Sequence, residues 1–394
     1  MEKKKPEIRF NGFEGEWVTT TLGECFLERV ERSAEGELIS VTISQGVVRA
    51  SDLDRIDNSS NDKSNYKVVK VGDIAYNSMR MWQGACGYSL YKGICSPAYT
   101  VVIPQNNIDV VYCFYLFKRN ETLQLFRVNS QGLTSDTWNL KYPAFSQIQC
   151  SFPSLSEQEK IGLFLTTLDK LIAKLEAKLD KLRKLKQALL EKMFVNINRG
   201  EDETPEIRFK GYTDKWQVKE LREVFEMPTN RISGSELQAD RYISTEHILQ
   251  NFEGVEPTTS MPANLSAIRF FQNDILMANI RPYLKKIWLS DRNGGASSDV
   301  IVFHITIKSD PAFLYYELTN GQFIEYVMES IQGSKMPRGN KQAMQAFKIS
   351  IAPLSEQEQI GKCFTQIDTH FSKTSTKLTK LRNIKQSLLQ KMFA

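Results

Sequence analysis

The chain of 394 residues has few side chains that could hold a metal ion or build a disulfide framework. Its six cysteines form no Cys-x-x-Cys pair, and its three histidines (His247, His304 and His370) lie far from any close pair of cysteines. Structural zinc sites use closely spaced cysteine and histidine ligands, so we expect no metal site. Scattered unpaired thiols are typical of a reducing compartment, and we predict a cytoplasmic protein.

Long apolar runs are also absent. No stretch of about 18 apolar residues, the length that a membrane-spanning helix needs, occurs in the chain. The basic opening Met1-Glu2-Lys3-Lys4-Lys5-Pro6 has no apolar run behind it, as a secretory signal would require. We therefore expect no membrane partner.

The sequence lacks the common catalytic motifs. It contains no Walker phosphate-binding loop, no GxGxxG, no GxSxG and no HExxH. Nothing resembles the glycine-rich methyl-donor loop or the Asn/Asp-Pro-Pro-aromatic motif of a DNA adenine methyltransferase. This absence along the whole chain favours a binding subunit over an enzyme.

What the sequence does contain is a tandem repeat with an offset of 199 residues. The segments that recur are Pro6–Phe10 as Pro205–Phe209, Trp17 as Trp216, Leu155–Glu159 as Leu354–Glu358, and Lys192–Phe194 as Lys391–Phe393. Each half is long enough to bury its own core, so the pattern predicts a pseudo-symmetric protein rather than a solenoid of short repeats.

Each half ends in a long heptad pattern without internal proline. Apolar residues follow 4,3 spacing, which predicts two coiled-coil helices that act as spacers and contact a partner. The positions on which we base this prediction are Ile161, Leu168, Leu175, Leu182 and Leu189 in the first half, and Ile360, Ile367, Leu378, Leu381 and Leu388 in the second.

Two polar features accompany these helices. Ser156 with Glu159, and Ser355 with Glu358, have the spacing of a capping box and are expected to begin the helices. Lys186 and Lys385 interrupt the apolar seams at matching positions. A lone polar seam residue can set the register of two helices, or its charged end can reach the solvent at a loosely packed helix end.

The remainder of each half, about 18–150 and 217–349, has the pattern of a mixed α/β globe. Short β-type runs at 68–71, 99–103 and 300–305 are separated by turn residues, and helical stretches are expected at 110–127 and 311–330. The globes have diverged far more than the helical segments. This contrast indicates one shared partner for the helices and two different targets for the globes.

Acidic residues are missing from corresponding windows of the two globes. The intervals between Asp73 and Asp109, from Thr137 to Ser156, between Asp274 and Asp291, and between Glu329 and Glu356 contain basic, amide and aromatic residues instead. Such loops suit contact with phosphates and base edges, although an acid-free window also arises in ordinary domains. Core packing remains the more common role for Trp82, Trp138 and Trp288. The candidate DNA-binding residues are Asn77, Arg80, Trp82, Gln83, Gln131, Thr134, Ser135 and Asn139 in the first half, and Asn279, Arg281, Tyr283, Lys285, Ser334, Lys335, Arg338, Asn340 and Lys341 in the second.

Taken together, these motifs resemble the specificity (S) subunits of type I restriction–modification systems over the whole chain. The resemblance rests on Pro6–Phe10 with Trp17, on Gly72-Asp73-Ile74, and above all on the segment from Leu155-Ser156-Glu157-Gln158-Glu159 to Lys192-Met193-Phe194. All recur in the second half, except that Asn273 replaces Gly72.

The resemblance implies an α+β protein with two target-recognition domains (1–154 and 198–353) and two antiparallel spacer helices (155–197 and 354–394). It implies that each domain reads half of a split sequence in double-stranded DNA. Two methyltransferase (M) subunits would dock on the helices and use S-adenosylmethionine, and restriction (R) subunits would bring ATP and Mg²⁺ chemistry. The chain itself would have no catalytic site, cofactor or metal. The alternative that the residues leave open is a coiled-coil adaptor that holds two protein partners and binds no DNA.

Overall fold

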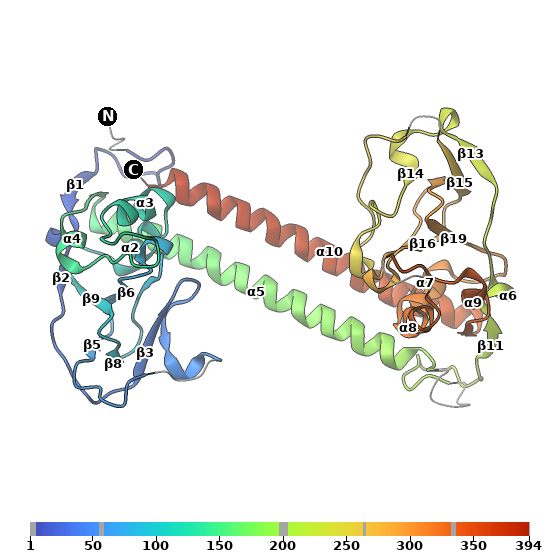
Figure 1. Ribbon diagram of the computed structural model, residues 1–394, viewed down its shortest axis with the longest axis horizontal. Coiled ribbons are helices and arrows are strands. Elements are labelled where there is room, and N and C mark those ends of the chain that lie inside the picture. The colour runs from blue at the N-terminus through green and yellow to red at the C-terminus, as the bar shows by residue number, and fades with distance from the viewer. Residues whose placement is uncertain (1–4, 55–58, 197–203, 263–264, 332–335, 394) are drawn as a thin grey trace. The chain divides into compact units, whose positions relative to one another are not determined.

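The computed structural model describes residues 5–54, 59–196, 204–262, 265–331 and 336–393 (Figure 1). The chain folds into two compact units. Unit 1 comprises Met1–Glu176 and Thr376–Ala394, and unit 2 comprises Ala177–Ser375. The two long helices, α5 (Leu155–Met193) and α10 (Leu354–Lys391), each contribute one part to unit 1 and the other to unit 2. The prediction of two mixed α/β domains with two long packed helices is confirmed.

Unit 1 contains one strand pair and two four-stranded sheets. Strand β1 (Val18–Thr21) pairs with β10 (Gln149–Phe152). The first sheet has the order β2-β9-β6-β7, formed by Phe26–Glu28, Tyr99–Pro104, Ile74–Asn77 and Cys86–Tyr88. The second has the order β4-β3-β8-β5, formed by Gly46–Arg49, Leu38–Thr42, Gly93–Cys95 and Lys67–Val69. The short helices are α1 (Leu22–Cys25), α2 (Val110–Leu116), α3 (Asn120–Val128) and α4 (Tyr142–Ser146), with 3₁₀ turns η1 (Ala50–Asp52) and η2 (Met81–Gln83).

Unit 2 repeats the strand pair and the first sheet. Strand β11 (Gln217–Glu220) pairs with β20 (Lys348–Ile351), and the first sheet has the order β12-β19-β16-β17, formed by Phe225–Glu226, Val300–Ile305, Ile275–Ala278 and Ile287–Leu289. The second sheet has the order β13-β15-β18-β14, formed by Arg231–Ser233, Ser266–Phe270, Gly294–Ala296 and Tyr242–Ile243. The helices are α6 (Leu221–Val224), α7 (Pro311–Thr319), α8 (Gln322–Glu329) and α9 (Lys341–Gln345), with 3₁₀ turns η4 (Gly234–Glu236), η5 (Ala239–Arg241), η6 (Gln250–Phe252) and η7 (Pro282–Leu284).

The divergence between the globes is concentrated in the second sheet. Strands β8 and β18 occupy the same place, because each has one parallel and one antiparallel neighbour. The remaining strand of each sheet is added at a different edge. In unit 1, β4 pairs with β3, the parallel neighbour of β8, whereas in unit 2, β13 pairs with β15, the antiparallel neighbour of β18. The faint sequence repeat across the globes therefore conceals a change of strand order.

The helical stretches expected at 110–127 and 311–330 each form two helices. In unit 1, Arg119 has an extended backbone conformation and separates α2 from α3. In unit 2, Gly321 has a φ of 109° and separates α7 from α8. Glycine adopts this left-handed region without the steric penalty that a Cβ atom brings, so the break is built into the sequence.

The apolar seams of α5 and α10 face one another in both units, as the heptads predict. The ten positions named for the seams are all buried or half-buried. In unit 1, Asp169 of α5 lies 2.5 Å from Lys385 of α10, and Glu176 accepts a hydrogen bond of 2.6 Å from Arg382. From the first pair to the second, the residue number rises on α5 and falls on α10, so the two helices run antiparallel in unit 1.

The seam lysines form matching ion pairs. Lys186 Nζ lies 2.6 Å from Asp368 Oδ1 in unit 2, which is the counterpart of Lys385 and Asp169 in unit 1. A tyrosine hydroxyl donates to each aspartate, from Tyr316 to Asp368 and from Tyr115 to Asp169, at 2.7 Å in both cases. A seam lysine that pairs with one fixed carboxylate favours the register role over simple solvation of the charged end.

The prediction that capping boxes begin the long helices was wrong. Helix α5 already includes Leu155, so Ser156 lies inside it, and α10 likewise includes Leu354. The polar residues that follow make tertiary contacts instead. Gln158 accepts a hydrogen bond of 3.0 Å from Asp109 N, and Gln357 accepts one of 2.9 Å from Asp310 N. The repeated Ser-Glu-Gln-Glu segment therefore joins each long helix to the short helix α2 or α7.

An ion pair between a half-buried arginine and a buried glutamate explains why the opening motif recurs with the helix start. Arg9 donates from Nε and Nη2 to Glu157, both at 2.7 Å. Arg208 donates in the same way to Glu356, at 2.9 and 2.7 Å. Bidentate pairs of this kind fix orientation as well as charge. The two segments that the sequence repeats most faithfully are thus partners in space.

The Lys-Met-Phe motif closes the core of each unit. Phe393, at the end of α10, stacks on Tyr112 in unit 1 with ring centroids 5.1 Å apart. Phe194, at the end of α5, packs on Phe313 in unit 2 at 5.4 Å. Ile8 N donates to Lys391 O and Ile207 N to Lys192 O, both at 2.9 Å. The end of α10 therefore returns to the first segment of the chain, as expected from antiparallel helices, while residue 394 lies outside the described residues.

Candidate nucleic-acid interface

The candidate residues of the first half lie on two loops of unit 1, which together we call surface 1. One loop, Asn77–Gly84, joins β6 to β7, and the other, Gln131–Asn139, joins α3 to α4. Arg80 is exposed at the start of η2, and Gly84 ends this turn with a φ of 81°. Asn77 closes the turn because its side chain accepts a hydrogen bond from Met79 N at 3.1 Å. The amide of Asn77 therefore shapes the loop.

Two tryptophans bring these loops together. The rings of Trp82 and Trp138 meet edge to face with centroids 5.2 Å apart, and the Arg127 guanidinium lies 5.1 Å from the Trp138 ring centre. Leu140 N also donates to Ser78 O at 2.8 Å. Both tryptophans are half-buried, so they support the loops, and Trp288 in unit 2 is buried, in agreement with a packing role.

Lys118 holds the loop Asn77–Gly84 in place through its ammonium group. Its ammonium group donates to Ile43 O at 2.6 Å and to Gly84 O, and it lies 5.3 Å from the Phe114 ring centre. Burial lowers the pKa of Lys118. Sequence reasoning missed both Lys118 and Arg127, because each acts through a contact with a residue distant in the sequence.

The candidate residues of the second half lie on corresponding loops of unit 2, which we call surface 2. The first, Asn279–Lys286, joins β16 to β17, and the described part of the second is Met336–Lys341, before α9. Arg281 N donates to Pro337 O at 2.8 Å and Gly339 N to Asn279 O at 3.2 Å. The structure thus brings the two acid-poor windows of unit 2 into contact, as it does in unit 1.

Arg281 and Lys285 flank the η7 turn in an unusual backbone conformation. Their φ angles are 54° and 53°, in the left-handed region that residues with a Cβ atom rarely adopt. Both side chains are exposed, and Tyr283 between them is 49% exposed. This turn therefore presents two cations and one aromatic ring to solvent.

Some of the remaining candidate side chains are exposed to solvent, and others contact neighbouring residues. Gln131, Thr134, Ser135 and Lys341 are exposed, and Gln83 is half-buried. Arg338 pairs with Asp299 at 3.0 Å while it stays 55% exposed. Asn340 instead caps α9, because its side chain accepts hydrogen bonds from Gln342 N and Ala343 N at 3.0 and 3.2 Å. Asn139 is half-buried, and its side-chain oxygen Oδ1 is buried without a hydrogen-bond partner. Ser334 and Lys335 lie outside the described residues.

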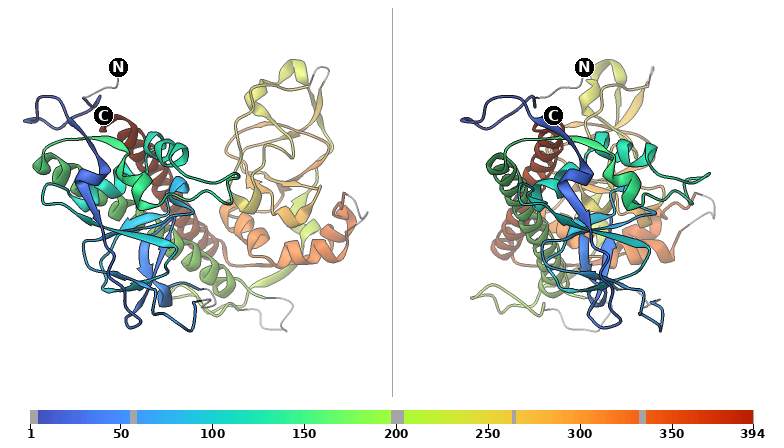
Figure 2. Two further views of the ribbon diagram at one scale, coloured as in Figure 1. Left: turned by 60° about the vertical axis from the view of Figure 1, so that its left-hand side comes forward. Right: turned by 90° about the vertical axis from the view of Figure 1, so that its left-hand side faces the viewer.

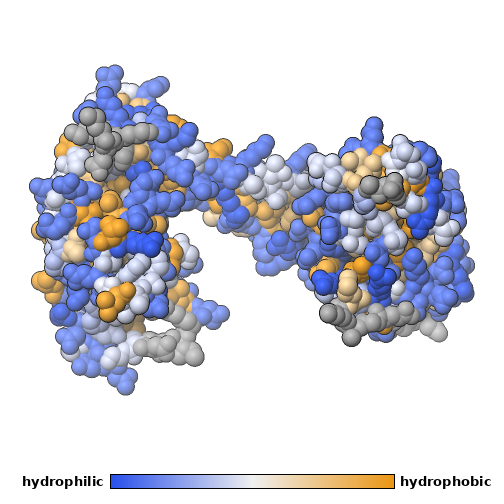
Figure 3. Space-filling view, turned by 45° about the horizontal axis from the view of Figure 1, so that its top comes forward, coloured by the Kyte–Doolittle hydropathy of each residue, from blue (hydrophilic) through white to orange (hydrophobic). Residues whose placement is uncertain are grey.

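Among the described residues, no group of three or more histidine, cysteine, aspartate or glutamate side chains is placed to hold a metal ion. No helix in the same part of the chain is long and apolar enough to cross a lipid bilayer. In the view of Figure 3 the surface is mainly hydrophilic, with apolar side chains in small patches.

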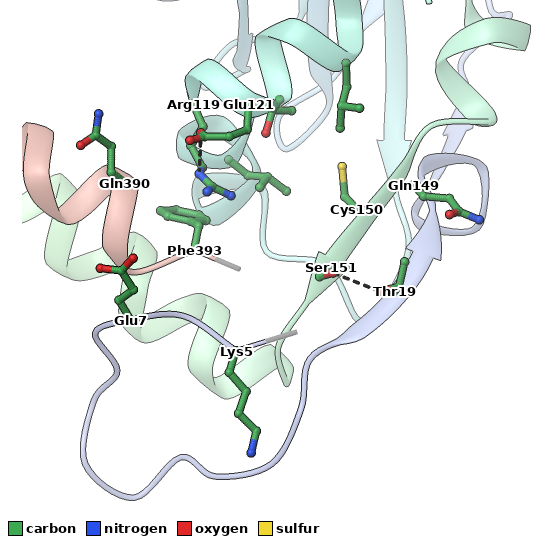
Figure 4. Close-up of a pocket in the computed structure, with 13 residues that line it drawn as sticks. Lys5, Glu7, Thr19, Arg119, Glu121, Gln149, Cys150, Ser151, Gln390 and Phe393 are labelled. Carbon is green, nitrogen blue, oxygen red and sulfur yellow. Dashed lines mark hydrogen bonds and ion pairs between the residues drawn. The ribbon is translucent and has the colours of Figure 1, made fainter. Parts of the chain in front are cut away.

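A separate cavity of about 470 Å³ lies in unit 1 near the end of α10 (Figure 4). Arg119 lies 5.3 Å from the Phe393 ring centre and 3.5 Å from Glu121, and the Thr19 and Ser151 hydroxyls are 3.0 Å apart. Lys5 and Glu7 add one charge of each sign to the lining. This balance favours an ion of neither sign, and we assign the cavity no ligand.

Comparisons with known proteins agree with this arrangement. The family model for the type I restriction modification DNA specificity domain matches residues 16–184 and 213–383. The EcoDI specificity subunit of Escherichia coli is 22% identical over 327 residues, 75% of this chain and 71% of that protein. The MjaVIII specificity subunit of Methanocaldococcus jannaschii is 22% identical over 329 residues, 76% and 73% of the two chains.

One solved structure supports the fold. The crystal structure of the S subunit of a type I restriction–modification system from M. genitalium aligns with a TM-score of 0.62 at 15% identity, over 99% of both chains. The family model matches both repeats and most of the sequence. The chain therefore belongs to the type I restriction–modification DNA specificity family, and it is the non-catalytic DNA specificity subunit of such a system.

Proposed function

We propose that this subunit reads a bipartite target in double-stranded DNA, with surface 1 on one half-site and surface 2 on the other. The observation that carries this proposal is the equivalent position of the two surfaces. Each lies on the loop between the third and fourth strands of the shared sheet, joined to the loop before the last short helix. Arginine, lysine and amide side chains in such loops can contact phosphates and base edges.

The two half-sites are expected to differ in sequence. The loops differ in their side chains, and the second sheets differ in the place of their fourth strand. Within this proposal, residues 1–154 and 198–353 are the target-recognition domains, and 155–197 and 354–394 are the spacer segments. The exposed candidates on each surface contact DNA, whereas Asn77 and Asn340 support their loops.

We infer that α5 and α10 provide the docking sites for two M subunits. Their seam residues are directed inward, which leaves the remaining faces exposed for a partner. S-adenosylmethionine would bind to the M subunits, and ATP and Mg²⁺ would serve R subunits that join the complex. The role of this chain is then to bind DNA and to orient its partners, in the cytoplasm.

The test is to map methylated adenines in a genome whose host carries this subunit with its M partner. We expect one motif with two defined half-sites and a fixed gap. Methylation that follows no bipartite motif would contradict the proposal. Gel shifts at several salt concentrations address the adaptor alternative, because phosphate contacts cause a steep loss of affinity as salt rises. An adaptor without DNA contacts would show no DNA shift at any salt concentration.

Arg281→Ala should relax recognition in one half-site only. An arginine that contacts guanine contributes about 1–3 kcal/mol of discrimination, so the methylated motif should become degenerate at one position read by surface 2. Arg222→Ala is the matched control, because Arg222 is also exposed, pairs with Glu220 and lies on α6, outside the two loops of surface 2. Degeneracy in both half-sites would show that Arg281 acts on assembly instead.

A further inference from the structure

The loop Gln131–Asn139 carries an apolar residue, Leu133, whose side chain is exposed to solvent. Leu133 is fully exposed, more so than any other large apolar side chain among the described residues. In Figure 2 this loop, between α3 and α4, projects from the rest of unit 1. At the tip of this projecting turn, Leu133 contributes no hydrophobic stabilisation to the fold, and its whole side chain is free to contact a ligand.

The tip has a defined turn that holds Leu133 outward. Thr137 N donates to Thr134 O at 2.9 Å, and Thr134 N donates to the Thr137 hydroxyl at 3.1 Å. Gly132 has a φ of 141°, and a Cβ atom there would lie 2.6 Å from Thr137 O. The glycine is therefore required by this turn, and Leu133 follows it directly.

The base of the loop connects the tip to the rest of surface 1. Gln131 and Asn139 exchange backbone hydrogen bonds at 3.1 and 2.8 Å, and Trp138 packs against Trp82 of the neighbouring loop. The turn thus extends outward from the same surface that carries Arg80. Thr134 and Ser135 add exposed hydroxyl groups beside the leucine, and Asp136 adds one exposed carboxylate.

We propose that Leu133 enters a groove of the DNA and makes an apolar contact with a base of the half-site read by unit 1. This inference rests on the proposed function and assigns a specificity-determining residue within it. The methyl group of thymine offers an apolar surface in the major groove, which an apolar side chain such as leucine can contact. The neighbouring hydroxyls of Thr134 and Ser135 can hydrogen-bond to base edges or phosphates.

A protein partner is the less suitable occupant. Protein interfaces derive most of their affinity from clusters of packed apolar and aromatic residues. Leu133 has only polar residues and glycine beside it in the loop, from Gln131 to Thr137. A single apolar tip among hydroxyl and amide groups fits the polar wall of a DNA groove better.

The experiment compares methylation motifs from cells that carry the complete complex with wild-type subunit, Leu133→Ala or Leu90→Ala. Leu90 is a matched control, because it is 64% exposed in the turn that joins β7 to β8, outside surface 1. We expect Leu133→Ala to reduce discrimination about tenfold at one base pair, equivalent to about 1.4 kcal/mol. The affected half-site should be the one that Arg281→Ala leaves unchanged, and Leu90→Ala should preserve the wild-type motif.

Three results would overturn the inference: a motif for Leu133→Ala identical to wild type, equal loss in both half-sites, or the same loss for Leu90→Ala. Binding of the purified complex to specific and random duplexes gives an independent measurement. Leu133→Ala should weaken only the specific complex and leave the salt dependence unchanged, since it removes no phosphate contact. If the wild-type complex itself yields no bipartite motif, the proposed function fails; if only the Leu133→Ala result is negative, the function stands and this inference falls.

Discussion

Arg208→Met is expected to destabilise unit 2 by about 3–5 kcal/mol, because it leaves a buried carboxylate without its ion-pair partner. Glu356 is fully buried and accepts two hydrogen bonds from Arg208 and one of 3.1 Å from Trp216 Nε1. Methionine retains much of the apolar stem of arginine but supplies no donor. The Trp216 indole N–H is then the remaining hydrogen-bond donor to the Glu356 carboxylate, which is shielded from water. Thermal denaturation of the full chain, followed by circular dichroism, should show a lower melting temperature.

Arg222→Met provides the matched control for this prediction. Arg222 pairs with Glu220 at 2.5 Å, but its side chain is 64% exposed. Exposed ion pairs contribute about 0–1 kcal/mol, so its loss should change the melting temperature little. The double variant Arg208→Met/Glu356→Gln should recover part of the stability, since it removes the isolated charge. Equal melting temperatures for Arg208→Met and the wild type would contradict the structural role of the pair.

The elements that depend on periodicity and repetition could be predicted from the sequence. The heptads specified both long helices and their facing seams. Where the repeated motifs differ, with Asn273 in place of Gly72, both residues have a left-handed backbone, with φ of 74° and 88°. Glycine and asparagine are the residues that most readily adopt this conformation, so the one departure between the motifs preserves the backbone. Prediction from the sequence failed where side chains depend on distant partners. Ser156 and Glu159 have the spacing of a capping box, but α5 already includes Leu155, and the residues between them, Glu157 and Gln158, bind Arg9 and the start of α2.

The candidate interface was predictable as a set of loops, although the role of each side chain was not. The missing acidic residues identified windows that do meet in each unit. Asn340 had the composition of a base-reading residue, yet local backbone geometry makes it a helix cap. Conversely, Leu133 carries no signal of nucleic-acid binding, and its significance follows only from its exposure on a defined turn.

Glu317→Gln is expected to remove a pH-dependent loss of stability in unit 2. Glu317 lies on α7 inside the core, accepts a hydrogen bond of 3.0 Å from Ser350 N, and has Asn320 Nδ2 at 3.3 Å from its second oxygen. Burial raises its pKa from 4.5 to about 8. The folded protein therefore holds the proton more tightly than the unfolded chain, and stability is greatest below pH 4.5 as far as this group is concerned. It falls as pH rises to about 8, by about 1.4 kcal/mol for each unit between the two pKa values.

Glutamine preserves the acceptor for Ser350 N and cannot ionise. The melting temperature of the wild type should fall between pH 5 and pH 9 more steeply than that of Glu317→Gln, and the variant should be the more stable of the two above pH 8. Glu325→Gln is the control, because Glu325 is exposed on the neighbouring helix α8. Unit 1 has Leu116 at the corresponding position of α2, after the matched caps Asp109 and Asp310, so it lacks this titration. Parallel pH profiles for the wild type and Glu317→Gln would mean that water or a local rearrangement keeps the carboxylate ionised at little cost.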